Sequence, residues 1–417
     1  MQIKRDLYLN KLISHKHNGM VKIITGVRRC GKSYLLFNLF QEHLLFAGVK
    51  PNHIISLALD DYDNRDKQNP DALYSYVKNK ITDNDTYYVL LDEIQLVPNF
   101  ENVLNGFLRL NNVDIYVTGS NSKFLSSDVI TEFRGRGDEV RVYPLCFAEY
   151  YSVVGGDFNS AWITYSNYGG MPLCLSMETP QDKMQYLTNL FQMTYLSDII
   201  NRYNLKGNAE INELTDTIAS SIGSLTNPTK LTNTFNSVKN IKLSVNTLTS
   251  YLEYLQDAFL IEKATRYDIK GKRYINTPVK YYFVDVGLRN ARLSFRQKED
   301  GYIMENIIYN ELRLRGYSVD VGVVENVIKE NGKYVRTKLE VDFVVNLGDK
   351  RYYIQSASSM PTAEKLEQEQ ASLLSINDAF RKIIIVNQPM LSRYNENGIL
   401  LVSLSDFLLN LSQIINM

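Results

Sequence analysis

The chain has 417 residues, of which 44% are hydrophobic and 22% are charged, an ordinary globular composition with room for more than one domain. Its 46 basic and 46 acidic residues cancel, so a general attraction to nucleic acid or to anionic membranes is not expected. The amino-terminal residues are too polar for a signal peptide, and no apolar stretch reaches the roughly 18 residues of a membrane span. We therefore expect a cytoplasmic protein without a membrane partner.

Cysteine and histidine are few and scattered. The three cysteines, Cys30, Cys146 and Cys174, lie far apart, which argues against a disulfide framework and favours a reducing compartment. None of the four histidines joins a cluster with them. We expect no metal site built from protein ligands alone.

The first third of the chain alternates strand-like and helix-like runs. Apolar residues at helical spacing predict a helix over 33–45. Runs rich in β-branched and apolar residues predict strands at 21–25, 53–59, 87–91 and 113–118. Strands that alternate with helices favour a parallel sheet covered by helices, and hence an α/β fold.

The remaining chain predicts helices first and a mixed region afterwards. Residues 158–204 are mainly helical, with Gly169-Gly170-Met171-Pro172 marking a helix start and a long amphipathic helix over 182–202. Two or three helices follow, the last with Ser244 as its N-cap, and then a hairpin of strands at 259–264 and 279–284. After residue 301 we expect helices at 302–314 and 363–374 and strands at 318–324, 339–346, 351–356 and 382–386.

A glycine-rich stretch follows the first strand and opens the first helix. Its sequence, Gly26-Val27-Arg28-Arg29-Cys30-Gly31-Lys32-Ser33, matches the P-loop pattern G-x-x-x-x-G-K-[ST]. The glycines let the backbone curl so that its N–H groups point at phosphate oxygens, and the helix N-terminus adds partial positive charge. Lys32 would reach the β- and γ-phosphates, and the Ser33 hydroxyl would bind Mg²⁺. We expect Gly26 to Tyr34 to bind ATP with Mg²⁺; the alternative is an ordinary glycine-rich turn.

An acidic pair ends the strand at 87–91. Asp92 is suited to hold Mg²⁺, usually through water, and Glu93 to orient and polarise the attacking water. Such a pair is often only a solvated turn, but the P-loop upstream favours a catalytic role.

Two further segments contain candidate catalytic residues. In Thr118-Gly119-Ser120-Asn121, Ser120 or Asn121 could contact the γ-phosphate or its water, although the segment could also be a capping turn. Arg136 lies in a glycine-rich segment, where an arginine can stabilise charge on the phosphate of a neighbouring subunit in a homo-oligomer. An arginine in such a loop is more often an ordinary surface residue.

Taken together, these residues resemble those of the AAA+-type ATPases of bacteria and archaea that carry a C-terminal domain of unknown function. The resemblance rests on Thr25–Ser33, Leu91–Gln95, Val117–Ser122, Gly135-Arg136, Tyr143–Tyr150, Tyr168–Pro172, Asp198–Arg202 and Glu340–Val344. It implies an AAA+-like ATPase core at 1–155, a helical lid at 156–206 that begins near the nucleotide with Gly169–Pro172, a winged helix at 207–296 and an endonuclease-like domain at 297–417.

The endonuclease-like resemblance implies metal-binding residues, but this sequence keeps only some of them. Glu305 fits the helix glutamate and Asp342 the strand aspartate, whereas Gln355 and Ala357 stand where a Glu-x-Lys pair is expected. A neutral amide is a poorer Mg²⁺ ligand than a carboxylate, and no lysine remains at that position. We therefore expect a degenerate domain without nuclease activity.

The hairpin turn of the implied winged helix carries Lys270, Lys272 and Arg273, which could contact DNA phosphates. A short basic cluster is more often a solvated turn, so DNA and a protein remain alternative partners. The leading hypothesis is an Mg²⁺-dependent ATPase whose hydrolysis drives or gates movement of the winged-helix and C-terminal domains. The alternative is a nucleotide-gated interaction switch with little turnover.

Overall fold

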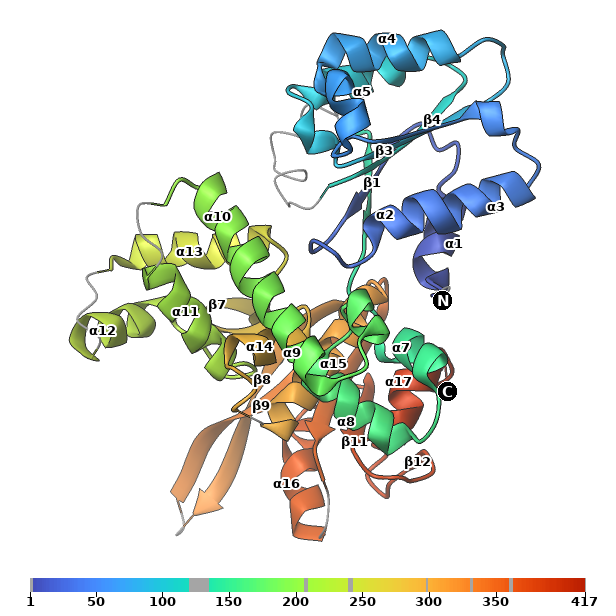
Figure 1. Ribbon diagram of the computed structural model, residues 1–417. Coiled ribbons are helices and arrows are strands. Elements are labelled where there is room, and N and C mark those ends of the chain that lie inside the picture. The colour runs from blue at the N-terminus through green and yellow to red at the C-terminus, as the bar shows by residue number, and fades with distance from the viewer. Residues whose placement is uncertain are drawn as a thin grey trace. The chain divides into compact units, whose positions relative to one another are not determined.

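The computed structural model describes residues 3–119, 135–205, 209–238, 243–297, 299–330, 333–359 and 363–416. The chain forms two compact units (Figure 1). The first comprises Met1–Pro144 with Asp257–Phe259, and the second comprises Leu145–Gln256 with Leu260–Met417. The boundaries expected at 155, 206 and 296 all fall inside the second unit, and they stay predictions.

The first unit is built on a parallel sheet. Its strands are β1 (Val21–Thr25), β2 (Ile54–Ala58), β3 (Tyr87–Asp92), β4 (Val113–Thr118) and β5 (Gly137–Arg141). All neighbours pair in parallel in the order β2-β3-β4-β1-β5. Every residue of β3 is buried, as expected for a continuous apolar run in a covered sheet. The predicted α/β sheet is confirmed, and β5 is an additional strand.

Helices cover both faces of this sheet. They are α1 (Asp6–Ser14), α2 (Lys32–Tyr34), α3 (Gln41–Phe46), α4 (Pro70–Lys80) and α5 (Phe100–Phe107). A π-helical turn at Leu35–Phe40 joins α2 to α3, so the helix predicted over 33–45 is continuous. Figure 1 shows α4 and α5 on one face and α2 and α3 on the other. Residues of α4 and α5 share a hydrophobic core with the strands, including Leu73, Val77 and Phe107.

The second unit begins with helices. They are α7 (Phe147–Val154), α8 (Phe158–Tyr168), α9 (Pro180–Asn189), α10 (Ser197–Arg202), α11 (Ala209–Ser220), α12 (Pro228–Val238) and α13 (Val245–Asp257). A π-helical turn at Leu190–Leu196 makes α9 and α10 one run, which confirms the long helix predicted over 182–202. The Ser244 hydroxyl accepts a hydrogen bond from Thr247 N at 3.0 Å, as its predicted N-cap role requires.

The predicted helix start at Gly169–Pro172 differs from the structure. Gly169 terminates α8 with a φ of 67°, and only a short 3₁₀ helix, Pro172–Ser176, follows before α9. Glycine in the left-handed region ends helices more readily than it begins them, because the lack of a Cβ removes the steric penalty there.

An eight-stranded mixed sheet forms the rest of the second unit. Its strands are β6 (Ile261–Asp268), β7 (Arg273–Phe283), β8 (Ser318–Glu330), β9 (Lys333–Leu347), β10 (Lys350–Ala357), β11 (Arg381–Val386), β12 (Arg393–Tyr394) and β13 (Leu400–Ser403). The order is β12-β13-β11-β10-β9-β8-β6-β7. Because β6 pairs with both β7 and β8, the boundary predicted at 296 lies between strands of one sheet.

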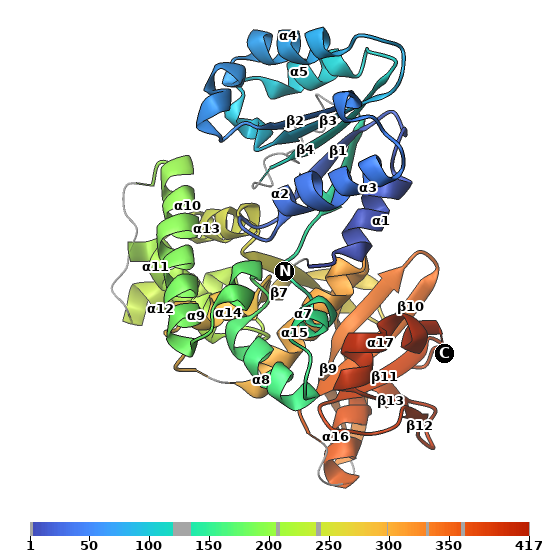
Figure 2. The same ribbon diagram turned by 45° about the vertical axis from the view of Figure 1, so that its right-hand side comes forward.

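Four helices accompany this sheet. They are α14 (Val286–Arg292), α15 (Asp300–Leu314), α16 (Ala363–Leu374) and α17 (Leu404–Asn416). Helix α15 packs against β7, β8, β9 and β10, and α16 packs against β9, β10 and β11 (Figure 2). Leu373 of α16 belongs to a core with Ala357 and Ile384 of the strands. The helices and strands predicted after residue 301 are thus present, and β8 and β9 are longer than predicted.

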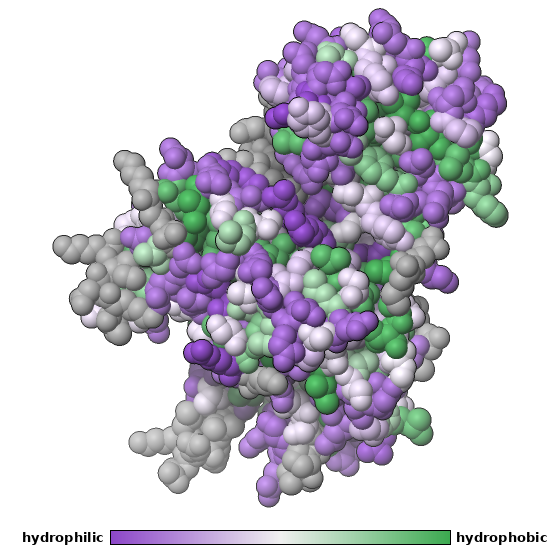
Figure 3. Space-filling view, in the orientation of Figure 1, coloured by the Kyte–Doolittle hydropathy of each residue, from purple (hydrophilic) through white to green (hydrophobic). Residues whose placement is uncertain are grey.

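The surface mixes hydrophilic and hydrophobic residues. Figure 3 shows hydrophobic residues near the end of α3, where Leu45 is 41% and Phe46 94% exposed. Isolated exposed apolar side chains of this kind are ordinary on proteins. In the described part of the chain, no helix combines the length and apolar character needed to cross a membrane.

Candidate nucleotide-binding site and the acidic cluster of the second unit

The P-loop curls tightly after β1. Gly26 has a φ of 136° and Gly31 a φ of 101°, both in the region that favours glycine. A Cβ on Gly26 would lie 2.0 Å from the Val142 carbonyl oxygen, so the close approach of these two segments requires glycine. The Lys32 ammonium donates hydrogen bonds to the carbonyls of Gly26 at 3.0 Å and Val27 at 3.1 Å. The lysine therefore already lies at the loop, where a phosphate would need a cation.

The other predicted P-loop residues differ in their exposure to solvent. Val27 and Cys30 are buried, and the Cys30 thiol donates to the Val142 carbonyl at 3.4 Å. Arg28, Arg29 and Ser33 are exposed, and Tyr34 is partly exposed. The buried residues pack the loop against the sheet, and the exposed residues are accessible to solvent or to a ligand.

Arg5, in the amino-terminal segment, stabilises the P-loop through hydrogen bonds. It is 2% exposed and donates to the carbonyl oxygens of Cys30 at 3.1 Å and Tyr143 at 2.6 Å. It thereby joins the P-loop to the segment after β5. Arg5 was not among the predicted site residues, because a lone arginine far from the motif gives no local signal.

The predicted acidic pair ends β3, and a threonine on β4 organises it. The Thr118 hydroxyl donates to Asp92 Oδ1 and accepts a hydrogen bond from Glu93 N at 3.0 Å. Asp92 is 4% exposed. Glu93 has a φ of 53°, so the chain bends sharply directly after β3. Gln95 Nε2 donates to the Glu93 carboxylate. Thr118 belongs to the motif Thr118-Gly119-Ser120-Asn121, but Ser120 and Asn121 were the residues of that motif predicted to be catalytic.

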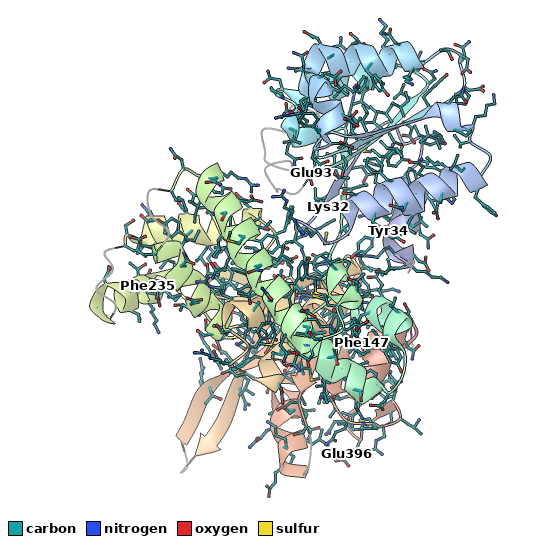
Figure 4. All side chains as sticks on the ribbon, viewed as in Figure 1. Lys32, Tyr34, Glu93, Phe147, Phe235 and Glu396 are labelled. Atoms are coloured by element: carbon teal, nitrogen blue, oxygen red, sulfur yellow. The ribbon has the colours of Figure 1, made fainter. Side chains whose placement is uncertain are left out.

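Sheet topology places these residues at one edge. The P-loop follows β1, Asp92 ends β3 and Thr118 ends β4, and all these strands run parallel with β4 between β1 and β3. The carboxyl ends of parallel strands meet at the same edge, where open α/β sheets usually bind ligands. In Figure 4, Lys32 and Glu93 both lie at this edge of the first unit's sheet.

The structure does not test a role at this edge for the other predicted catalytic residues. Ser120 and Asn121 lie outside the part of the chain that the structure describes. Arg136 is exposed, and its carbonyl accepts a hydrogen bond from Val21 N at 2.8 Å at the amino end of β1. It thus lies at the edge opposite the P-loop of its own chain, so a role as an arginine finger would concern a neighbouring subunit.

A trio of side chains precedes β2 and β3 at that opposite edge. Suitable ligand atoms of His53, Asp83 and Asp85 lie within 4.8 Å of one another. This grouping was not predicted from the sequence. The Lys50 ammonium contacts Asp85 at 3.2 Å and His53 contacts Asp83 at 3.0 Å, so both carboxylates have a partner within the chain.

In the second unit, the loop Gly169–Pro172 is fixed by Asp285. The Asp285 carboxylate accepts hydrogen bonds from Gly170 N at 2.7 Å and Leu288 N at 2.9 Å. A Cβ on Gly169 would lie 2.2 Å from this carboxylate. Burial raises the pKa of Asp285 to about 6, although the backbone hydrogen bonds act in the opposite direction. The glycines thus serve close packing, and the lid role implied for them stays a prediction.

The implied endonuclease-like residues Glu305 and Asp342 are buried in an ionic cluster. Burial raises the pKa of Glu305, and burial with the nearby charge of Glu305 raises the pKa of Asp342 to about 7. Ala357 stands at the expected lysine position, but the cluster contains a lysine from another strand, Lys280 of β7, whose ammonium contacts Glu305 at 2.8 Å and Glu340 at 2.7 Å. Burial alone would lower the pKa of Lys280, but these carboxylates outweigh it and raise that pKa.

Gln355 and Ala357 of β10 do not supply the carboxylate and the lysine of a Glu-x-Lys pair. Gln355 Oε1 accepts from Asp342 N at 3.3 Å and from Ser372 Oγ of α16 at 3.5 Å, and Ala357 lies in the hydrophobic core with Leu373. The residue between them, Ser356, donates to the Asp342 carboxylate. The sequence could not show this, because it depends on how β9 and β10 pair.

The basic turn between β6 and β7 is exposed. Arg273 contacts Asp268 at 3.4 Å, and Lys270 donates to the Glu325 carbonyl at 3.1 Å, so two of its cations already have partners in the chain. Thr226 forms an isolated bridge with Val279 of β7. The winged-helix interpretation of this region and its contact with DNA stay predictions.

Comparisons with known proteins identify the family of the chain. A family model described as an AAA domain matches residues 18–151, and one described as a domain of unknown function (DUF8612) matches residues 159–299. An uncharacterized protein of Haemophilus influenzae is 32% identical over 392 residues, which cover 93% of this chain and 94% of the relative. An uncharacterized protein of Methanocaldococcus jannaschii is 29% identical over 423 residues, which cover 97% and 88%.

Solved structures give weaker similarities. The ORC1 protein of Aeropyrum pernix in complex with DNA is 10% identical with a TM-score of 0.33, over 70% of this chain and 92% of that one. Cdc6p of Pyrobaculum aerophilum is 11% identical with a TM-score of 0.29, over 73% and 96%. Scores this low support no argument about function. The family follows from the long alignment to the Haemophilus relative and from the AAA domain matched at 18–151. The chain belongs to the AAA+-type ATPases that its motifs resemble.

Proposed function

We propose that this protein binds ATP with Mg²⁺ at the P-loop and hydrolyses it at the edge formed by Lys32, Asp92 and Glu93. The observation that carries the proposal is the threonine bridge, in which Thr118 contacts both Asp92 and Glu93 from the strand next to the P-loop strand. An acidic pair held in this way is more than a solvated turn.

The P-loop fits a triphosphate by its shape and charge. Its glycine at position 26 has no room for a Cβ, and the loop leads directly into a helix. Backbone N–H groups and the Lys32 ammonium would bind the phosphate oxygens, with the ammonium exchanging its present carbonyl acceptors for them.

The residues for Mg²⁺ also fit. The exposed Ser33 hydroxyl would contact the ion directly, and Asp92 would hold one of its water ligands. Mg²⁺ supplies charge compensation on the β- and γ-phosphates when bound. Thr118 keeps the Asp92 carboxylate oriented by its hydrogen bond.

Glu93 is the proposed general base. Its carboxylate would orient the attacking water and accept its proton in the transition state. Its backbone N–H is fixed by Thr118, so the side chain starts from a defined position at the edge of the sheet.

The test is Glu93→Gln in the full chain. ATP affinity should stay unchanged while phosphate release falls by about 100-fold or more, because only the proton acceptor is removed. Lys32→Ala should instead weaken ATP binding, measured by calorimetry. Unchanged turnover in Glu93→Gln would contradict the role of Glu93, and unchanged affinity in Lys32→Ala would contradict the site itself.

One contact favours a second candidate function, a nucleotide-gated switch with little turnover. The Gln95 side chain donates to the Glu93 carboxylate and so competes with a water for it. If Gln95 restrains Glu93, then Gln95→Ala should raise turnover several-fold without changing ATP affinity. Equal turnover in the two proteins would count against this restraint.

We propose that nucleotide state alters the second unit, which would then act on DNA or on a protein, and that homo-oligomers would bring Arg136 to a neighbour's phosphate. ATPase rates with and without double-stranded DNA separate the two partners. DNA stimulation that disappears in the Lys270→Ala/Lys272→Ala variant would support DNA contact at the basic turn.

A further inference from the structure

The acidic cluster of the second unit gathers side chains from separate elements. Glu305 comes from α15, Glu340 and Asp342 come from β9, and Lys280 comes from β7. Lys280 is 2%, Glu305 5% and Asp342 7% exposed. Buried carboxylates require a positive partner, because desolvation of an unpaired charge is very costly.

Lys280 lies between two of the carboxylates. Its ammonium nitrogen is 2.8 Å from Glu305 Oε1 and 2.7 Å from Glu340 Oε1. These are the distances of charge-assisted hydrogen bonds, so the ammonium uses its protons on the oxygens that a divalent cation would need. The Glu340 side chain is 34% exposed, so the cluster reaches solvent on that side.

Other protein groups also contact these carboxylates. Asp342 Oδ2 accepts from Ser356 N and from Ser356 Oγ, both at 2.8 Å. Glu305 Oε1, the oxygen that Lys280 contacts, also accepts from Tyr282 Oη at 2.6 Å. One oxygen of each carboxylate is thus engaged by the protein, and oxygens that surround a buried ammonium do not fit the metal that an endonuclease-like domain implies.

We propose that the Lys280 ammonium takes the place of a divalent cation in the cluster of Glu305, Glu340 and Asp342, so that this cluster excludes metal in the intact protein and gains a divalent-cation site when Lys280 is removed. A hard divalent ion among these oxygens would lie close to the ammonium and would be repelled by it. Without the ammonium, the same carboxylates supply the oxygen ligands that Mg²⁺ and Mn²⁺ prefer.

The test measures Mn²⁺ binding to the full chain without nucleotide. All proteins carry Asp92→Asn, so that the candidate nucleotide site does not contribute, and free Mn²⁺ is followed by electron paramagnetic resonance. Lys280→Met, of similar length but uncharged, is compared with Lys263→Met, which removes an exposed lysine from the neighbouring strand β6. Each is combined with Asp342→Asn, because only binding that this substitution removes belongs to the cluster.

We expect Asp342→Asn to leave Mn²⁺ binding unchanged in the parent and in Lys263→Met. We expect Lys280→Met to bind one additional Mn²⁺ with a Kd of about 1 mM or tighter, and Asp342→Asn to abolish this gain. Mn²⁺ should also raise the melting temperature of Lys280→Met but not that of the Asp342→Asn double variant.

Two results would overturn the proposal. The first is Mn²⁺ binding in the parent that Asp342→Asn or Glu305→Gln removes, which would make the cluster a working metal centre with Lys280 beside it. The second is a folded Lys280→Met that gains no Mn²⁺. If Lys280→Met fails to fold, Lys280→Met/Glu340→Gln, which buries less negative charge, replaces it in the same comparison, and the parent measurement still decides the first result.

Discussion

Thr118 connects the Asp92 carboxylate with the backbone of Glu93 at the candidate catalytic edge. Its hydroxyl donates to Asp92 and accepts from Glu93 N, so one small side chain sets the positions of both. Thr118→Val keeps the shape and removes the hydroxyl. Turnover should fall by about tenfold or more while ATP affinity changes little, because supporting contacts of this kind orient metal-binding groups.

The control for Thr118→Val is Thr164→Val, which removes a threonine hydroxyl that bonds within α8 of the second unit. Steady-state phosphate release and calorimetric ATP binding separate turnover from affinity. A Thr118→Val protein with parental turnover would show that the threonine bridge is not needed for hydrolysis.

Asp285 gives a residue-scale prediction about pH. Its folded-state pKa is raised to about 6, above the ordinary value of 3.8, so the folded protein holds this proton more tightly than the unfolded chain does. The free energy of unfolding should therefore fall as pH rises from about 4 to about 6. Above that range, the full free-energy cost of burying the charged carboxylate is present. Lowering the pH from 7.5 to 5 should raise the contribution of Asp285 to the free energy of unfolding by about 1 kcal/mol.

Asp285→Asn isolates this contribution, because other titrating groups act equally on both proteins. The difference in unfolding free energy between Asp285→Asn and the parent should change with pH by about that amount. Denaturant titrations at several pH values measure it. A difference that is constant from pH 7.5 to 5 would contradict the raised pKa.

At the scale of elements, the contact between α8 and α14 depends on the absence of a side chain. A Cβ on Gly287 would lie 2.0 Å from the Tyr168 carbonyl oxygen at the end of α8. Asn290 of α14 also donates to the carbonyls of Ser166 and Asn167 at 2.9 Å, so the two helices are joined by both packing and hydrogen bonds. Gly287→Ala must move α14 or break these bonds.

We expect Gly287→Ala to lower the free energy of unfolding by about 2 kcal/mol or more, since overpacking against backbone cannot relax easily. Gly301→Ala is the matched control, because Gly301 lies in α15 with nothing within 4 Å of its would-be Cβ. That control should be neutral or stabilising by up to about 1 kcal/mol. Equal effects of the two substitutions in urea unfolding would show that the close approach is not required.

At the scale of the whole molecule, the two compact units permit two unfolding transitions. The P-loop, Asp92 and Glu93 all belong to the first unit, so ATP with Mg²⁺ should raise the melting temperature of that unit. At about 100 times its Kd, the ligand should add about 2.7 kcal/mol to the stability of the folded site. Calorimetry with hydrogen exchange assigns each transition, and Lys32→Ala should remove the shift.

The sequence predicted those parts of the fold that local patterns encode. The P-loop, the buried strand before Asp92 and the helix over 363–374 were placed correctly, because glycine positions and apolar periodicity act over a few residues. The strands predicted at 339–346 and 351–356 are also present, as β9 and β10, which pair directly around Gly348.

What the sequence alone determined is therefore the α/β core, the glycine-rich loop after β1 and the acidic pair that ends β3, since each rests on neighbouring residues. Tertiary structure decided the contacts between distant residues: Arg5 with Tyr143 across 138 positions, Asp285 with Gly170 across 115, and Lys280 with Glu305 across 25. The physical reason is that a buried charge or a close backbone approach is satisfied by whichever element the fold brings near, and no local pattern records which element that is.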